Sequence, residues 1–223
     1  MMKQHQKDRL IAFIFISLMS FALPKLYPIT DVWLTGLSHA DQVVRLIAGG
    51  ATLIQLREKH ASPRDFYADA EAALRTARES GVRLIVNDRA DLALALKADG
   101  VHLGQDDLPP EAARELLGPH AIIGYSTHNI AQASAAARLP IDYLAIGPIY
   151  ATSSKENPDS EVGLEGLRQV RVAIGKLPLV AIGGITIERS RDVLEAGADS
   201  VACISALLAS PDEIEDRTRE FLR

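Results

Sequence analysis

The chain has 223 residues, of which 48% are hydrophobic and 24% are charged, and its formal net charge at pH 7 is −5. This length is sufficient for one well-buried domain of α/β barrel size. The negative net charge argues against a general nucleic-acid-binding surface, so an anionic ligand must be held by local positive groups. The single cysteine, Cys203, excludes an internal disulfide and fits a reducing cytoplasm.

The first 25 residues differ in composition from the rest of the chain. Basic residues precede an apolar run that extends to Leu23, which is the pattern of a signal peptide. The run is too short to predict a membrane span, and no Ala-x-Ala cleavage pattern follows it. Because Met19 lies directly before the globular pattern, we favour a translation start there over a genuine export or anchoring segment. Residues 1–25 are therefore interpreted as an N-terminal extension, and residues 26–223 as the catalytic domain.

From residue 26 onward, apolar runs typical of strands alternate with helical stretches. The predicted strands are 26–30, 52–56, 83–87, 101–104, 122–125, 143–147, 179–182 and 200–204. The predicted helices are 39–48, 63–79, 90–97, 109–117, 129–138, 164–175, 187–195 and 211–222. Eight such units in about 200 residues are what a closed (β/α)8 TIM barrel requires. A doubly wound sheet is the alternative, but it usually has fewer strands, and no Gly-x-Gly-x-x-Gly follows any strand here.

Two aspartates follow consecutive predicted strands, Asp88 after the third and Asp107 after the fourth. Parallel strands end on the same side of a sheet about 5 Å apart, so the two carboxylates approach each other. They repel unless a proton or a cation lies between them, and Mg²⁺ suits two carboxylates completed by water or phosphate. The pattern favours a magnesium site. The alternative is that both residues cap helices, and Asp106 competes with Asp107 for the second metal position.

Nearly all of the remaining predicted strands also end in polar or glycine residues, on the rim where barrel active sites form. Gln55, Arg57 and Lys59 alternate at the end of the second strand, so they share a face that suits a polar ring and a polyanion. The alternative is a solvated strand end. Lys155 lies in the longest connection, 148–163, and suits a phosphate as a point charge. Its alternative is a solvated lysine.

The seventh and eighth predicted strands end in Gly183-Gly184 and Ile204-Ser205. Glycine lets phosphate oxygens approach backbone N–H groups, and the loops after these two strands are the usual phosphate site of barrels. An ordinary tight turn is the alternative.

Ser126, His102 and His128 have several interpretations. Ser126 either hydrogen-bonds a substrate or packs in the core. His102 points into the barrel if its neighbours face the helices, which leaves a core role and an active-site role equally open. A nucleophilic pair of Ser126 and His128 lacks an orienting acid, so His128 is interpreted as structural or as a helix cap.

These strand ends, in this order, resemble the thiamine-phosphate synthase family from about residue 26 to residue 208. The matching motifs are Gln55-Leu56-Arg57-Glu58-Lys59, Asn87-Asp88, Gly104-Gln105-Asp106-Asp107, Gly124-Tyr125-Ser126-Thr127-His128, Gly147-Pro148-Ile149-Tyr150, Thr152 to Lys155, Ile182-Gly183-Gly184-Ile185 and Ile204-Ser205-Ala206. Together these motifs are highly specific.

The resemblance implies a barrel that joins 4-amino-2-methyl-5-hydroxymethylpyrimidine diphosphate to a thiazole phosphate, with Mg²⁺ held by Asp88 and Asp107. The implied pyrimidine diphosphate contacts are Gln55, Leu56, Arg57, Glu58, Lys59, Asn87, Ser126 and Lys155. The implied thiazole phosphate contacts are Thr152, Ser153, Ser154, Gly184, Ile204 and Ser205. The catalytic roles fall to Arg57, Lys59, Ser126 and Lys155. Ser154 replaces the family's usual threonine, which keeps the hydroxyl but loses a methyl group.

The implied mechanism is dissociative, because diphosphate leaves before the thiazole nitrogen attacks the pyrimidine-methyl cation. No protein nucleophile is required, which agrees with the lack of an obvious triad. A thiazole tautomerase of the same superfamily and a non-catalytic phosphate-ligand-binding barrel are the alternatives. Retention of Asp88, Asp107 and Lys155 disfavours both. The expected partners are small-molecule substrates in the cytoplasm, with no nucleic acid and no membrane for residues 26–223. A homo-oligomer is left open.

Overall fold

The computed structural model describes residues 22–152 and 159–223 of the chain. Three predicted contact residues, Ser153, Ser154 and Lys155, and most of the N-terminal extension lie outside the described residues. The described strands are β1 (Leu26–Pro28), β2 (Leu53–Leu56), β3 (Arg83–Asn87), β4 (Gly100–Leu103), β5 (Ile122–Thr127), β6 (Tyr143–Ile146), β7 (Leu179–Ile182) and β8 (Ser200–Cys203).

Helices follow every strand of the described residues, as the alternating pattern predicts. They are α2 (Val32–Thr35), α3 (His39–Ala48), α4 (Pro63–Glu79), α5 (Ala90–Leu96), α6 (Pro110–Leu117), α7 (Ile130–Ala136), α8 (Gly163–Ile174), α9 (Ile187–Glu195), α10 (Ser205–Leu208) and α11 (Ile214–Phe221), with a 3-10 turn at Pro211–Glu213. The short helices α2 and α10 were not predicted, because four residues carry no helical periodicity. Across residues 22–152 and 159–223, no helix has the length and apolar character needed to cross a membrane.

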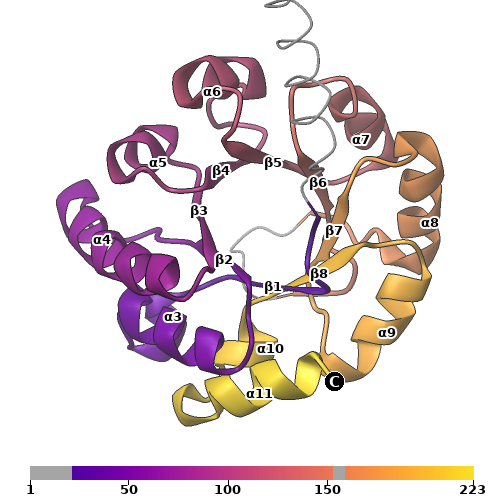
Figure 1. Cartoon of the computed structure of the whole chain (residues 1–223). Helices are drawn as coiled ribbons and strands as arrows, with labels where there is room; N and C mark the ends of the chain where they lie inside the picture. Colours follow the sequence, from indigo (N-terminus) through magenta and orange to yellow (C-terminus); the bar gives the residue numbers. More distant parts are fainter. Residues whose placement is uncertain (1–21, 153–158) are drawn as a thin grey trace, which may run out of the picture.

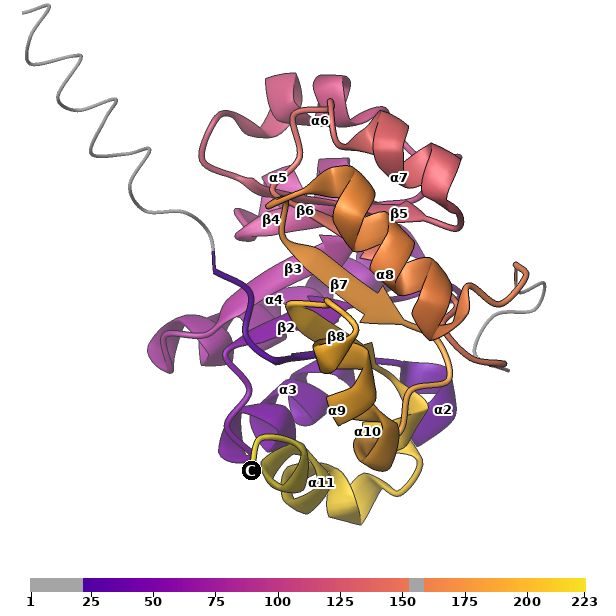
Figure 2. The same cartoon turned by 90° about the vertical axis from the view of Figure 1, so that its right-hand side faces the viewer.

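The strands form one parallel sheet in the order β1-β8-β7-β6-β5-β4-β3-β2. The two ends of this order meet, since Ile29 bridges Gln55 and the Thr30 N–H donates to the Gln55 carbonyl at 2.9 Å. The sheet therefore closes into a barrel with the helices outside it, as Figures 1 and 2 show. The predicted (β/α)8 barrel is confirmed, and the doubly wound alternative is wrong.

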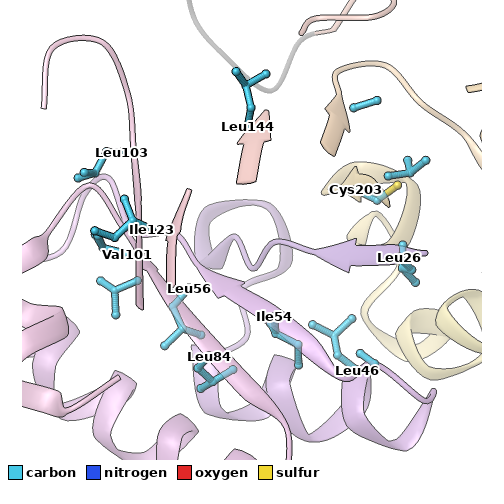
Figure 3. Packing of buried hydrophobic residues seen from close by; sticks show 14 of the residues in the cluster. Leu26, Leu46, Ile54, Leu56, Leu84, Val101, Leu103, Ile123, Leu144 and Cys203 are labelled. Atoms are coloured by element: carbon cyan, nitrogen blue, oxygen red, sulfur yellow. The ribbon is translucent and has the colours of Figure 1, made fainter. Parts of the chain in front are cut away.

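Side chains alternate between two apolar layers because successive strand residues point to opposite faces. Ile54 of β2 and Leu84 of β3 belong to the larger layer between strands and helices, together with Leu46 of α3 (Figure 3). Leu53 and Ile85 belong to the smaller layer inside the barrel. This alternation decides which polar residues point into the barrel, because inward-facing positions recur at every second residue up to the carboxyl end of each strand.

Three aspartates at the amino ends of the strands support the closed sheet. Asp99, Asp142 and Asp199 each precede an even-numbered strand, and each accepts a hydrogen bond from a backbone N–H in the first two residues of the preceding strand, at 2.8 Å in every case. The Asp142 carboxylate also accepts from the Arg114 guanidinium at 2.7 Å. These contacts stabilise the rim opposite the predicted active site.

We expect Asp142→Ala to lower the free energy of unfolding by about 2 kcal/mol, because it removes two hydrogen bonds to a charged acceptor. Urea unfolding measures this loss. Asp212→Ala is the matched control, since its carboxylate is fully exposed and lies 3.9 Å from Arg45. Equal stability of the two variants would show that the Asp142 contacts do not stabilise the rim.

Candidate active site

A cavity of about 580 Å³ opens at the carboxyl ends of the strands. Its lining includes eleven of the predicted site residues: Gln55, Arg57, Lys59, Asn87, Asp88, Asp107, Ser126, Thr152, Gly184, Ile204 and Ser205. Gln55, Arg57 and Lys59, at the end of β2, therefore face the same cavity, as the strand periodicity predicts. Asp106 and His102 line the same cavity.

Two predicted contact residues, Leu56 and Glu58, have side chains that lie away from this lining. Leu56 is fully buried in the layer between strands and helices. The Glu58 carboxylate accepts the backbone N–H groups of His60 and Ala61 at 2.6 and 3.0 Å, and it lies 3.3 Å from the His39 ring. Glu58 thus shapes the turn after β2, and neither of these two residues is part of the cavity lining.

The two cations after β2 both form ion pairs, and the Lys59 side chain is also exposed to solvent. The Arg57 guanidinium lies 3.1 Å from the Asp31 carboxylate. The Lys59 ammonium lies 2.5 Å from the Asp88 carboxylate. These acids hold both cations beside the cavity, where a polyanion would meet them.

Asp88 and Asp107 lie close enough for their carboxyl groups to interact, as their positions after adjacent strands predict. Asp88 adopts a left-handed conformation with φ of 62°, and its N–H donates to the His102 carbonyl at 2.8 Å. The Asp107 carboxylate accepts from the Gly104 N–H at 2.7 Å. Burial raises the pKa of Asp107, the Gly104 hydrogen bond opposes this rise, and the Asp88 charge adds to it.

Neither aspartate caps a helix. The N-cap residue of α5 is Arg89 and that of α6 is Pro109, and neither helix start has a side-chain capping hydrogen bond. The helix-cap alternative is therefore wrong for Asp88 and Asp107.

The carboxylate pair has the donor chemistry that Mg²⁺ requires. Its two acids come from adjacent strand ends, and the Asp88 carboxylate already lies against a positive charge, the Lys59 ammonium. Among the described residues, no cluster of three or more His, Cys, Asp and Glu side chains forms a complete cage. Mg²⁺ typically takes one or two carboxylates and completes its shell with water and substrate phosphates, so the pair fits this ion.

His102 points into the barrel and joins the candidate site. One ring nitrogen lies 2.9 Å from the Tyr143 hydroxyl, and the other lies 2.8 Å from the Ser126 hydroxyl. Burial lowers the pKa of His102 to about 4, so the ring is neutral near pH 7. The Ser126–His128 pair is wrong, because the His128 ring contacts the Gly147 carbonyl at 2.8 Å instead.

Sequence reasoning missed two buried tyrosines inside the barrel, Tyr27 and Tyr143. Their hydroxyls are 2.9 Å apart, and the Gln55 amide donates to Tyr27 at 3.1 Å. Strand alternation was the available signal, because Tyr27 shares the inner face with Ile29, and Tyr143 shares it with Ala145.

The turn after β7 requires glycine for both conformation and space. Gly183 and Gly184 have φ values of 101° and 63°. A Cβ atom on Gly184 would lie 2.3 Å from the Ala151 carbonyl oxygen and 2.9 Å from the Tyr150 Cβ. Gly184 therefore presents bare backbone to the cavity, with Ser205 after β8 lining the same space.

Comparisons with known proteins agree with this architecture. A family model described as thiamine monophosphate synthase matches residues 26–207. The thiamine-phosphate synthase of Koribacter versatilis is 50% identical over 208 residues, which cover 90% of this chain and 95% of that protein. The thiamine-phosphate synthase of Chloroflexus aurantiacus is 47% identical over 189 residues, which cover 84% of this chain and 87% of that protein.

A solved structure, the thiamine phosphate pyrophosphorylase from Pyrococcus furiosus, shares the fold and much of the sequence. It superposes with a TM-score of 0.79 at 38% identity, over 88% of this chain and 93% of that chain. The family model and these relatives span nearly the whole barrel, including each strand end that lines the cavity. The chain therefore belongs to the thiamine monophosphate synthase family and is an enzyme of the transferase class.

Proposed function

We propose that the chain joins 4-amino-2-methyl-5-(diphosphooxymethyl)pyrimidine to 4-methyl-5-(2-phosphoethyl)thiazole, or its carboxylated form, and releases thiamine phosphate and diphosphate. The observation that carries this proposal is one cavity with two regions suited to anions. The carboxylate pair and Lys59 lie at the ends of β2, β3 and β4, and the bare backbone of Gly184 lies after β7. These strands lie on opposite sides of the barrel (Figure 1). Two phosphorylated substrates can therefore bind from opposite sides and meet in between.

The pyrimidine ring is assigned to the inner part of the cavity. Gln55, Asn87 and Ser126 lie there, and their amides and hydroxyl offer both donors and acceptors. Gln55 is 2% exposed and Asn87 is 9% exposed, so these side chains are positioned by their surroundings before any ligand arrives. A polar heteroaromatic ring gains most from groups held in this way.

The diphosphate of the same substrate is assigned to the rim above that ring. Arg57 and Lys59 place positive charge there, and Asp88 and Asp107 are the residues that would hold Mg²⁺. Bound Mg²⁺ would supply charge stabilisation for the departing diphosphate. Arg57 and Lys59 stabilise the same growing charge, and Lys155 is assigned this role from the sequence.

No side chain of the cavity has to attack the substrate in this scheme. His102 is neutral, and its two ring nitrogens are engaged by hydroxyls. The Cys203 thiol is buried in the layer between strands and helices, and burial raises its pKa to about 12, so a thiolate nucleophile is disfavoured. Binding, orientation and charge stabilisation by the cavity residues are sufficient for a dissociative transfer.

Incubation of the full chain with both substrates and Mg²⁺ tests the proposal. We expect thiamine phosphate and diphosphate in equal amounts, no product from either substrate alone, and loss of product in EDTA. Conversion of the thiazole phosphate alone, without diphosphate release, would indicate the tautomerase alternative and overturn the proposal.

A further inference from the structure

Five side chains form a continuous chain of hydrogen bonds across the inside of the barrel. In order they are Gln55 of β2, Tyr27 of β1, Tyr143 of β6, His102 of β4 and Ser126 of β5. The successive distances are 3.1, 2.9, 2.9 and 2.8 Å. We call this set the inner hydrogen-bond chain. Its two ends, Gln55 and Ser126, both line the cavity and lie on different strands.

The inner hydrogen-bond chain can run in one direction from the Gln55 end, with each hydroxyl donating to the next member. The Gln55 amide nitrogen can only donate, so the Tyr27 oxygen accepts from it. In this direction Tyr27 donates its proton to the Tyr143 oxygen, and Tyr143 donates its proton to Nδ1 of His102; both contacts also permit the reverse direction. A neutral imidazole that accepts at one nitrogen donates at the other, so Nε2–H of His102 donates to the Ser126 oxygen.

This direction leaves defined hydrogen-bonding groups at both ends. The Ser126 oxygen already accepts from His102, so its proton is available to an acceptor in the cavity. The side-chain amide nitrogen of Gln55 donates to Tyr27, so the side-chain carbonyl oxygen Oε1 of Gln55 is available to a donor in the cavity. The two ends together present one donor and one acceptor toward the same space.

The backbone of β5 is shaped to admit the inner hydrogen-bond chain. A Cβ atom on Gly124 would lie 2.3 Å from the Tyr143 hydroxyl oxygen and 2.5 Å from Nδ1 of His102. Any side chain at position 124 would therefore occupy the place of that hydrogen bond. The tyrosines and the histidine are also almost completely buried, which shields their hydrogen bonds from water.

We propose that Tyr27, Tyr143 and His102 are positioning residues that set Ser126 as a hydrogen-bond donor and Gln55 as an acceptor toward the aminopyrimidine ring. The proposal rests on the proposed function, because such a ring offers nitrogen acceptors and an amino donor. A ring with the opposite arrangement of donors and acceptors would leave a buried polar group unpaired at each end.

The direction of the inner hydrogen-bond chain can be measured without any substrate. Imidazole ¹H–¹⁵N correlation spectra of the full chain report which nitrogen of His102 carries the proton, and His102→Gln identifies its signals. We expect a neutral ring protonated at Nε2. Gln55→Glu exchanges the donor facing Tyr27 for an acceptor, so we expect the proton to move to Nδ1. A wild-type ring protonated at Nδ1, or no response to Gln55→Glu, would overturn the proposal.

Kinetics test the consequence for the substrate. We expect Tyr143→Phe and Tyr27→Phe each to lower kcat/KM for the pyrimidine diphosphate about ten-fold, with KM for the thiazole phosphate unchanged. Tyr67→Phe is the matched control, because Tyr67 lies on α4 outside the cavity. His102→Gln, which keeps an N–H donor, should retain more activity than His102→Leu.

Equal losses for both substrates, or equal activity of His102→Gln and His102→Leu, would overturn the positioning role. An inactive wild-type chain would instead count against the proposed function, and the proton position on His102 would still decide the direction of the inner hydrogen-bond chain.

Discussion

Replacing either Asp88 or Asp107 with asparagine is expected to lower kcat about 1,000-fold while leaving the barrel folded. The two carboxylates are interacting neighbours at the cavity, and removing one charge removes half of the proposed protein contribution to Mg²⁺ binding. Steady-state turnover across a range of Mg²⁺ concentrations measures the effect. Circular dichroism and thermal unfolding verify that the variants remain folded.

Asp106→Asn is the matched control for this experiment. Asp106 is exposed and lines the same cavity, but the Asp107 carboxylate is the one held by the Gly104 N–H beside Asp88. We expect the kcat of Asp106→Asn to stay within about three-fold of wild type, because no contact holds the Asp106 carboxylate beside Asp88 among the described residues. A larger loss for Asp106→Asn than for Asp107→Asn would assign the second metal position to Asp106.

Gly184→Ala is expected to raise KM for the thiazole phosphate at least about 30-fold. A Cβ atom there would lie 2.3 Å from the Ala151 carbonyl oxygen, so the turn that faces the cavity must move. The backbone approach assigned to the phosphate is lost with that movement. Initial rates at varied thiazole phosphate and saturating pyrimidine diphosphate measure the change.

Gly175→Ala separates crowding at the site from backbone strain. Gly175 ends α8 with φ of 64°, nearly the same as the 63° of Gly184, but a Cβ atom there meets nothing within 4 Å. Both variants should lose at least about 1 kcal/mol of stability, because each residue has a positive φ that L side chains rarely adopt; Gly175, with ψ of −119°, lies outside the left-handed helical region. Only Gly184→Ala should change KM. Equal KM values in the two variants would show that Gly184 does not form the phosphate site.

The barrel and the acid pair were predictable because both depend on short-range pattern. Strand-then-helix repetition predicts the barrel, and parallel strands necessarily bring Asp88 and Asp107 to the same rim. The same alternation places Arg57 and Lys59 on one face and Glu58 on the other. The family motif suggested a continuous run of contacts, but the structure follows the alternation, with Glu58 turned toward His39.

The contacts that escaped prediction join residues far apart in the chain. Tyr27 and Tyr143 are 116 positions apart, so no local pattern links their hydroxyls. The Ser126–His128 pairing failed for a local reason: β5 ends at Thr127, and His128 no longer follows strand geometry. The partner of Ser126 is His102 on the adjacent strand, which becomes visible only with the β4–β5 register.

The position of the metal is the most direct test of this account of the site. We would grow crystals of the full chain with the pyrimidine diphosphate and Mn²⁺, which accepts the oxygen ligands of Mg²⁺ and gives an anomalous signal. The account predicts an anomalous peak within bonding distance of both the Asp88 and Asp107 carboxylates and of the diphosphate. A peak bonded to Asp106 in place of Asp107, or bonded to the diphosphate without either aspartate, would contradict it.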